Sequence, residues 1–219
     1  MKKNSPLYII MFMIFISGVF GLGVSFVHNV TLGQLEMNAR LYRNRIITSA
    51  FKLEVPLSTP TGYEQALEEN LDDYEIVKSG RVWHVYISKN EPKRIGFIFR
   101  GMGFWDVIEG IMVLSPDLDT IYNVRFLDQK ETPGLGARIE EEWFVGQFQG
   151  YPIAWDDPVN ARITFGGRSP KEGKRIDAIT GATQTSMAVE RILNSELQAF
   201  KELYESENLQ KYQQQNGKE

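Results

Sequence analysis

The stretch DAITGATQTS, residues 177–186, stands directly before a strongly helical run of sequence. Apolar side chains then recur at the three-and-four spacing of an amphipathic helix, at Val189, Ile192, Leu193, Leu197, Phe200 and Leu203. The hydroxyl-bearing residues of the stretch are therefore expected at the N-terminus of a helix. The first backbone N–H groups of a helix lack intrahelical partners, and the positive end of its dipole lies there, so a phosphate or another anion is favoured.

Two roles are open to this stretch. Gly181 and Ala182 carry little side-chain bulk, so a ligand or a modifying enzyme can approach the neighbouring hydroxyls closely. Alternatively, Thr183, Thr185 or Ser186 merely caps the helix, which is a common role for such residues. Spacing alone favours the cap.

The same string resembles the flavinylation motif, Ser/Thr-Gly-Ala-Thr, of the FMN-binding domain family. This domain is found in the G subunit of Rnf ion-translocating complexes and in the C subunit of the sodium-translocating NADH:quinone oxidoreductase. In that family the phosphate of FMN is esterified to the last threonine of the motif, which corresponds here to Thr183. The resemblance implies a covalent FMN whose surroundings include Asp177, Thr180, Gly181, Ala182 and Thr185.

A second motif, ETPGLGAR at residues 131–138, is expected to form a rigid, sharply turning loop. Its proline and glycines let backbone amides approach a ligand, while Glu131 and Thr132 supply polar groups. By itself it would be an ordinary Pro-Gly turn, and its spacing does not fit a dinucleotide fingerprint. However, ETPGLG is similar to the loop that lines the FMN site in the same Rnf and sodium-pump proteins. That resemblance adds Gly134, Leu135 and Gly136 to the expected cofactor-binding residues.

A third and weaker match is GMGFW, residues 101–105, which resembles the Gly-x-Gly-Leu-Trp segment of the sodium-pump protein. It suggests that Trp105 binds the flavin ring. Packing of Phe104 and Trp105 in the core is an equally good account of these two aromatic residues.

The composition limits the chemistry that this chain can perform. The net charge of -4 argues against nucleic acid as a partner, because there is no basic surplus to neutralise phosphates. The absence of cysteine excludes disulfides, thiol catalysis, iron–sulfur clusters and c-type haem attachment, and with two histidines a multi-histidine metal site is not expected. If the protein carries electrons, an organic cofactor must hold them.

Residues 7–27, LYIIMFMIFISGVFGLGVSFV, contain no charge and are long enough to cross a bilayer core of about 30 Å as a helix. The apolar run exceeds a signal-peptide core and no Ala-x-Ala site follows it, so a retained anchor is expected rather than a cleaved signal or a buried helix. Lys2 and Lys3 precede the span, and the next basic residue is Arg40. The positive-inside rule then predicts a single-pass protein of the inner (cytoplasmic) membrane, with a cytoplasmic N-terminus and an extracytoplasmic flavin domain.

The remaining pattern predicts an α+β domain in which helices pack on a mainly antiparallel sheet. A juxtamembrane helix is expected at 31–51, a linker at 56–60 and an acidic helix at 62–71. Strands are expected at 82–87, 94–100, 108–114, 120–127 and 161–165, with a hairpin between the first two. The predicted division of the chain is 1–28 for the N-terminus and transmembrane helix, 29–60 for the juxtamembrane helix and linker, 61–204 for the FMN-binding domain, and 205–219 for a polar, disordered tail.

The predicted function is that of an electron-transfer component of a redox-driven, Rnf-type or Nqr-type ion-translocating complex, which is not catalytic alone. The expected partners are the other subunits of that membrane complex, the lipid bilayer, and a flavin-transferring enzyme that attaches the cofactor. One alternative is a flavinylated carrier of an extracellular electron-transfer or respiratory-regulator system that pumps no ion. The other is a membrane-anchored binding module without redox chemistry, in which the threonine motif only caps a helix.

Overall fold

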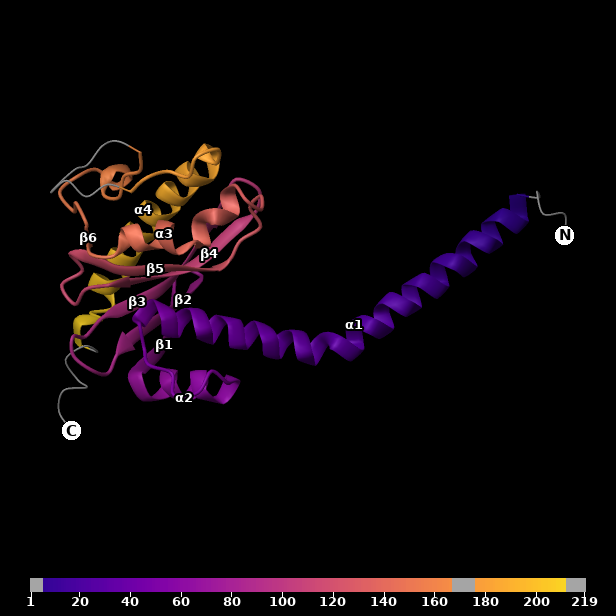
Figure 1. Ribbon diagram of the computed structural model, residues 1–219, viewed down its shortest axis with the longest axis horizontal. Coiled ribbons are helices and arrows are strands. Elements are labelled where there is room, and N and C mark those ends of the chain that lie inside the picture. The colour runs from indigo at the N-terminus through magenta and orange to yellow at the C-terminus, as the bar shows by residue number, and fades with distance from the viewer. Residues whose placement is uncertain (1–5, 167–175, 212–219) are drawn as a thin grey trace. The chain divides into compact units, whose positions relative to one another are not determined.

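The computed structural model describes residues 6–166 and 176–211. A long apolar helix is followed by a six-stranded antiparallel sheet with packed helices, which confirms the predicted α+β class (Figure 1). The helical elements are α1 (Pro6–Phe51), α2 (Pro60–Asn70), η1 (Gly136–Glu140), α3 (Glu142–Val145), η2 (Gly146–Phe148), η3 (Val159–Ala161) and α4 (Thr183–Ser206).

Helix α1 runs without interruption for 46 residues, so the predicted membrane span and juxtamembrane helix are parts of one helix. Among the described residues it is the one helix long and apolar enough to cross a membrane. The chain divides into two compact units, residues 1–42 and 43–219. The last turns of α1 therefore belong to the second unit, together with the sheet.

The sheet is a meander in which each strand pairs with the next one along the chain. The strands are β1 (Leu71–Lys78), β2 (Arg81–Ser88), β3 (Ile95–Met102), β4 (Val107–Leu114), β5 (Thr120–Asp128) and β6 (Tyr151–Pro152). The predicted strands corresponding to β2 to β5, and the β2–β3 hairpin, are confirmed. Strand β1 was not predicted, because the acidic residues Asp72, Asp73 and Glu75 interrupt its apolar pattern, as is common in an edge strand.

The strand predicted at 161–165 is wrong. The segment follows η3 and pairs with another segment only through one bridge between Phe165 and Ile176. The side chain of Asn194 on α4 takes the place of a strand partner: its Oδ1 accepts from Ile163 N at 2.9 Å and its Nδ2 donates to Ile163 O at 2.7 Å. The backbone is thus satisfied without a ladder.

Each face of the sheet is covered by a different helix. Helix α4 packs on one face, where the rings of Phe97 and Phe200 stack with centroids 4.0 Å apart. The end of α1 packs on the other face through Ile47, Ala50 and Phe51. A Cβ at Gly96 of β3 would lie 2.7 Å from the Phe51 ring, so the close approach of this helix end requires glycine.

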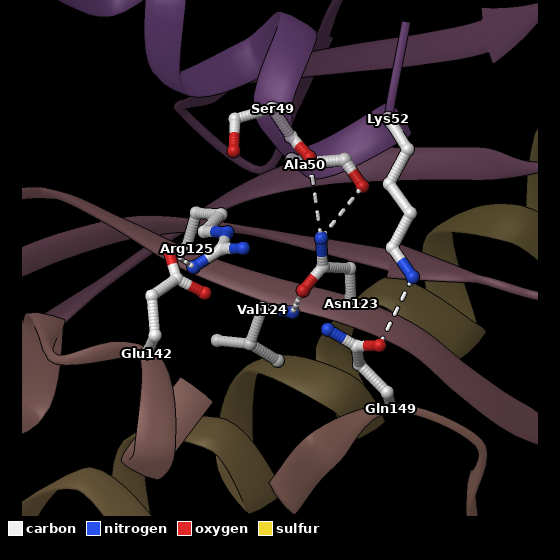
Figure 2. Close-up of polar contacts among 8 residues, drawn as sticks. All are labelled: Ser49, Ala50, Lys52, Asn123, Val124, Arg125, Glu142 and Gln149. Carbon is white, nitrogen blue, oxygen red and sulfur yellow. Dashed lines mark hydrogen bonds and ion pairs between the residues drawn. The ribbon is translucent and has the colours of Figure 1, made fainter. Parts of the chain in front are cut away.

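Asn123 of β5 fixes the C-terminal end of α1 (Figure 2). Its fully buried side chain donates to the carbonyl oxygens of Ser49, at 3.3 Å, and Ala50, at 3.0 Å, and accepts from Val124 N at 3.0 Å. The last carbonyls of a helix have no intrahelical donor, and this amide supplies one inside the core. Nearby, Lys52 donates to Gln149 at 2.9 Å. The segment predicted to lift the domain away from the membrane therefore ends as part of the core of the domain.

The C-terminal helix extends farther than the sequence pattern predicts. Helix α4 ends at Ser206, and Leu209 is buried in the main core. The first residues of the predicted disordered tail are therefore helical or packed, because Leu209 still finds an apolar contact. Residues 212–219 of that tail lie outside the described residues.

Replacing Asn123 with alanine is expected to lower the free energy of unfolding by about 2–3 kcal/mol, because buried carbonyls at the end of α1 lose their donor. Lys52→Met is the matched control at the same junction. It breaks an exposed hydrogen bond and should cost about 0.5 kcal/mol or less. Urea unfolding of the detergent-solubilised chain measures both, and equal costs would contradict the role given to Asn123.

Candidate functional site

Three separate segments meet at the N-terminus of α4. They are the turn between β3 and β4, the loop after β5, and the stretch that leads into α4. Between them lies a cavity of about 400 Å³, lined by Phe104, Trp105, Thr132, Leu135, Gly136, Gly181, Ala182, Thr183, Gln184 and Thr185. All three motifs singled out in the sequence contribute to this one cavity.

Helix α4 begins at Thr183, three residues before the expected start, and its N-cap is Ala182. Within the described residues, no side chain caps this end of the helix. The interpretation of the hydroxyls as caps is therefore wrong: Thr185 donates to Glu131, and Ser186 donates to Ala182 O and accepts from Ile179 N. The Thr183 residue is exposed at the cavity.

The turn between β3 and β4 carries two aromatic residues at its tip. It is closed by the hydrogen bond from Gly103 N to Asp106 O at 2.8 Å, with Phe104 and Trp105 between them. The two rings contact each other edge to face at 5.0 Å, and the residues are 50% and 63% exposed. Core packing is thus wrong for this pair, which forms a wall of the cavity.

Glu131 joins the aromatic turn to α4. Its Oε1 accepts from the backbone N–H groups of Phe104, at 2.8 Å, and Trp105, at 3.1 Å, while its Oε2 accepts from the Thr185 hydroxyl at 2.7 Å. The residue is 4% exposed and does not line the cavity. Next to it, Trp105 Nε1 donates to Thr132 Oγ1 at 3.0 Å. The first residues of ETPGLG therefore hold the aromatic turn in place.

The remaining residues of that loop explain its proline and glycines. Leu135 N donates to Thr132 O at 3.1 Å, which closes a turn with Pro133 second and Gly134 third, at φ 74°. A Cβ at Gly136 would lie 2.5 Å from Thr185 Oγ1, so only glycine fits between the loop and α4. Leu135 in turn lies against Gly181, whose φ of 81° also favours glycine.

Not every predicted site residue reaches the cavity. Gly134, Asp177 and Thr180 do not line it. The backbone N–H of Asp177 donates to Gln147 Oε1 at 2.7 Å, which ties the stretch to η2. The predicted set omitted Phe104 and Gln184, although both stand inside the quoted motifs. Their exposure at a turn tip and on a first helical turn could not be inferred from residue type.

The charges at the rim of the cavity are paired. Asp106 lies 3.2 Å from Lys130 and also accepts from Val107 N at 2.7 Å. The Val107 N–H and then the nearby ammonium of Lys130 hold the pKa of the Asp106 carboxyl below its usual range.

A second cavity of about 430 Å³ lies farther along α4, lined by Val159, Asn160, Met187, Glu190, Arg191, Asn194 and Ser195. It contains none of the residues predicted from the motifs. The cavity at Thr183 is the candidate site because an exposed hydroxyl, an aromatic wall and the end of a long helix coincide there. Its volume lies in the range of about 300–1,000 Å³ common for small-molecule sites.

Comparison with known proteins supports this choice. Residues 103–198 match the family described as the FMN-binding domain. The C subunit of the Na⁺-translocating NADH-quinone reductase of Pasteurella multocida is 35% identical over 108 residues, which cover 48% of this chain and 42% of that protein. The Neisseria meningitidis serogroup A protein of the same name is 33% identical over 124 residues, covering 54% and 48%. The chain thus spans about half the length of these curated relatives.

Two solved structures share the fold. The crystal structure of Shewanella oneidensis NqrC superposes with a TM-score of 0.59 at 16% identity, covering 74% of this chain and 99% of that chain. The C subunit of the same reductase from Parabacteroides distasonis gives a TM-score of 0.61 at 20% identity, covering 74% and 91%. This chain contains an FMN-binding domain and is homologous to the NqrC component of the Na⁺-translocating NADH-quinone reductase.

The two loop glycines should respond differently to alanine. Gly134→Ala strains a left-handed residue and should cost about 1–2 kcal/mol of unfolding free energy. Gly136→Ala should cost about 2–3 kcal/mol, because the new methyl group overlaps Thr185 Oγ1. In a Thr185→Ala background the cost of Gly136→Ala should shrink while that of Gly134→Ala stays the same. Urea unfolding of the single and double variants tests this, and additive effects for Gly136 would contradict the contact.

Proposed function

We propose that this chain is a membrane-anchored flavoprotein with FMN bound covalently through a phosphoester to Thr183. It relays electrons as one component of a redox-driven, ion-translocating membrane complex of the Nqr or Rnf type. The observation that carries the proposal is the Thr183 residue, exposed at the uncapped N-terminus of α4 in a cavity that three flavin-family motifs share.

The first turn of α4 suits the phosphate of the cofactor. Backbone N–H groups at the start of a helix lack intrahelical acceptors, and the helix dipole adds positive potential there. Gly181 and Ala182 precede Thr183 and leave its surroundings open on the side of the cavity. A phosphoester at Thr183 would place its negative charge against these donors.

The aromatic turn suits the ring system of the cofactor. Phe104 and Trp105 present exposed faces at the rim, and Leu135 adds an apolar side chain across the cavity. Bound FMN would supply a carrier that takes up and gives off electrons singly or in pairs. The part of these three side chains is to hold the ring and cover one side of it from water.

Attachment of the cofactor is proposed to need a separate flavin-transferring enzyme. Esterification of a threonine requires a base that activates its hydroxyl. The hydrogen bonds of the buried neighbours Glu131, Thr185 and Ser186 are made with one another or with the backbone, and none of them reaches Thr183. The exposure of Thr183 leaves the hydroxyl accessible to such an enzyme.

The apolar part of α1 is proposed to anchor the protein in the inner (cytoplasmic) membrane. Lys2 and Lys3 precede it and the next basic residue is Arg40, so the charge bias places the N-terminus in the cytoplasm and the flavin domain outside. We place the start of that domain near Arg43, because the last turns of α1 pack in its core. The other subunits of the complex and the bilayer are the proposed partners.

Thr183→Ala is expected to give a folded protein without covalent flavin, with unfolding free energy within about 0.5 kcal/mol of the parent because the residue is exposed and caps nothing. Peptide mass spectrometry should find the mass of FMN on the peptide containing Thr183 and not on the same peptide of the variant. Thr180→Ala, an exposed hydroxyl three residues earlier, is the matched control and should keep the flavin on Thr183. Flavin on Thr185 or Ser186, or retained in Thr183→Ala, would refute the site.

A reporter enzyme that is active only outside the cytoplasm, fused after Glu219, is expected to be active. The control carries the same reporter behind a chain in which Lys2 and Lys3 are replaced by glutamate, which should reduce the active fraction because the charge bias is removed. Reporter activity confined to the cytoplasm would overturn the orientation.

A further inference from the structure

The carboxylate of Glu131 sits behind the cavity at Thr183 and not in its lining. Both of its oxygens accept hydrogen bonds from protein groups: two backbone N–H groups of the aromatic turn and one hydroxyl of α4. A group whose oxygens are all engaged in this way acts on a ligand through its neighbours. These neighbours, Phe104, Trp105 and Thr185, do line the cavity.

The carboxylate has one place to occupy. A Cβ at Gly103 would lie 2.5 Å from Glu131 Oε1, and a Cβ at Gly136 would lie 3.0 Å from Oε2. The two glycines, which belong to two different motifs, therefore leave just enough room for this group. Because its Oε1 holds both amides at the tip of the turn, the exposed rings of Phe104 and Trp105 are fixed relative to the start of α4.

The charge of this group is not neutralised by a cation among its hydrogen-bond partners. The three donors are neutral, and Lys130, the residue before it in the chain, is paired with Asp106. Burial lowers the local dielectric response, so a negative charge acts over a longer distance than it does at the surface. A group that gains electrons next to such a charge becomes harder to reduce, for the same reason that a like charge disfavours ionisation.

We propose that Glu131 is the positioning residue of the flavin site: it sets the place of the aromatic turn against α4, and its buried charge lowers the reduction potential of the flavin held at Thr183. This inference rests on the proposed function. It assigns Glu131 no contact with the cofactor, in contrast to the expectation from the motif, which counted it among the cofactor-binding residues.

Glu131→Gln tests the charge. The amide oxygen still accepts from both backbone N–H groups and the amide nitrogen faces the Thr185 hydroxyl, so the shape is retained while the charge is lost. Spectroelectrochemical titration of the flavinylated, detergent-solubilised chain should show a rise in midpoint potential. A tenfold change in the equilibrium constant corresponds to about 59 mV for one electron, and we expect a rise of this order. Glu68→Gln, which removes an exposed charge on α2, should leave the potential unchanged.

Glu131→Asp tests the position. This variant keeps the charge but is one methylene shorter, so it cannot reach the aromatic turn and Thr185 together. In a flavin-free Thr183→Ala background with fluorine-labelled tryptophan, the resonance of Trp105, assigned by its loss in Trp105→Phe, should shift and broaden. The same resonance should stay in place in Glu131→Gln.

The outcomes separate this inference from the proposed function. Absence of flavin from the parent chain would refute the proposed function, and the fluorine spectra would still test the position of Trp105. With flavin present, an unchanged potential in Glu131→Gln would overturn the role of the charge, and an unchanged Trp105 resonance in Glu131→Asp would overturn the positioning. If the Glu131 variants do not fold, Thr185→Val takes their place: it removes one donor and keeps the charge, so the potential should fall, and no change would overturn the inference.

Discussion

A single buried carboxylate decides the form of the candidate site. Glu131 comes from the loop after β5, and its oxygens are divided between the tip of the β3–β4 turn and the first turn of α4. A buried carboxylate must have all of its acceptor capacity used, because an unpaired charge away from water is costly. The surrounding backbone therefore has to bring three donors to one point. The glycines at 103 and 136 exist in this structure because any side chain there would displace the carboxylate or its partners.

The sheet carries this arrangement by keeping its two faces apart in function. On one face α4 packs along its length and presents its N-terminus beside the aromatic turn. On the other face the last turns of α1 are built into the core, and Asn123 pairs with their carbonyls. The helix that contains the apolar span and the helix that carries Thr183 thus meet opposite faces of the same strands. The sheet connects the proposed anchor to the proposed flavin site.

The proposed role as an electron carrier follows from the site and not from the fold. The two solved relatives share the fold at 16% and 20% identity, which says nothing by itself about chemistry. The match of residues 103–198 to the FMN-binding domain covers the aromatic turn, the Glu131 loop and the start of α4 together. An exposed threonine beside uncapped amides and an aromatic wall is an arrangement that suits a phosphate and a flat ring at the same time.

The sequence by itself determined the α+β class, strands β2 to β5, the long apolar helix and the motif residues of the site, because each of these has a local pattern of apolar spacing, turn residues or family resemblance. It did not determine β1, whose acidic residues hide its pairing, or the segment 161–165, which has the pattern of a strand but takes its hydrogen bonds from Asn194. Nor could it show that Thr185 and Ser186 do not cap α4, that Phe104 and Trp105 are exposed, or that Asn123 completes α1. These features depend on partners far away in the chain. Only the tertiary structure decides which donor meets which acceptor, because a polar group shows its hydrogen-bonding capacity in the sequence but not the partner that folding brings to it.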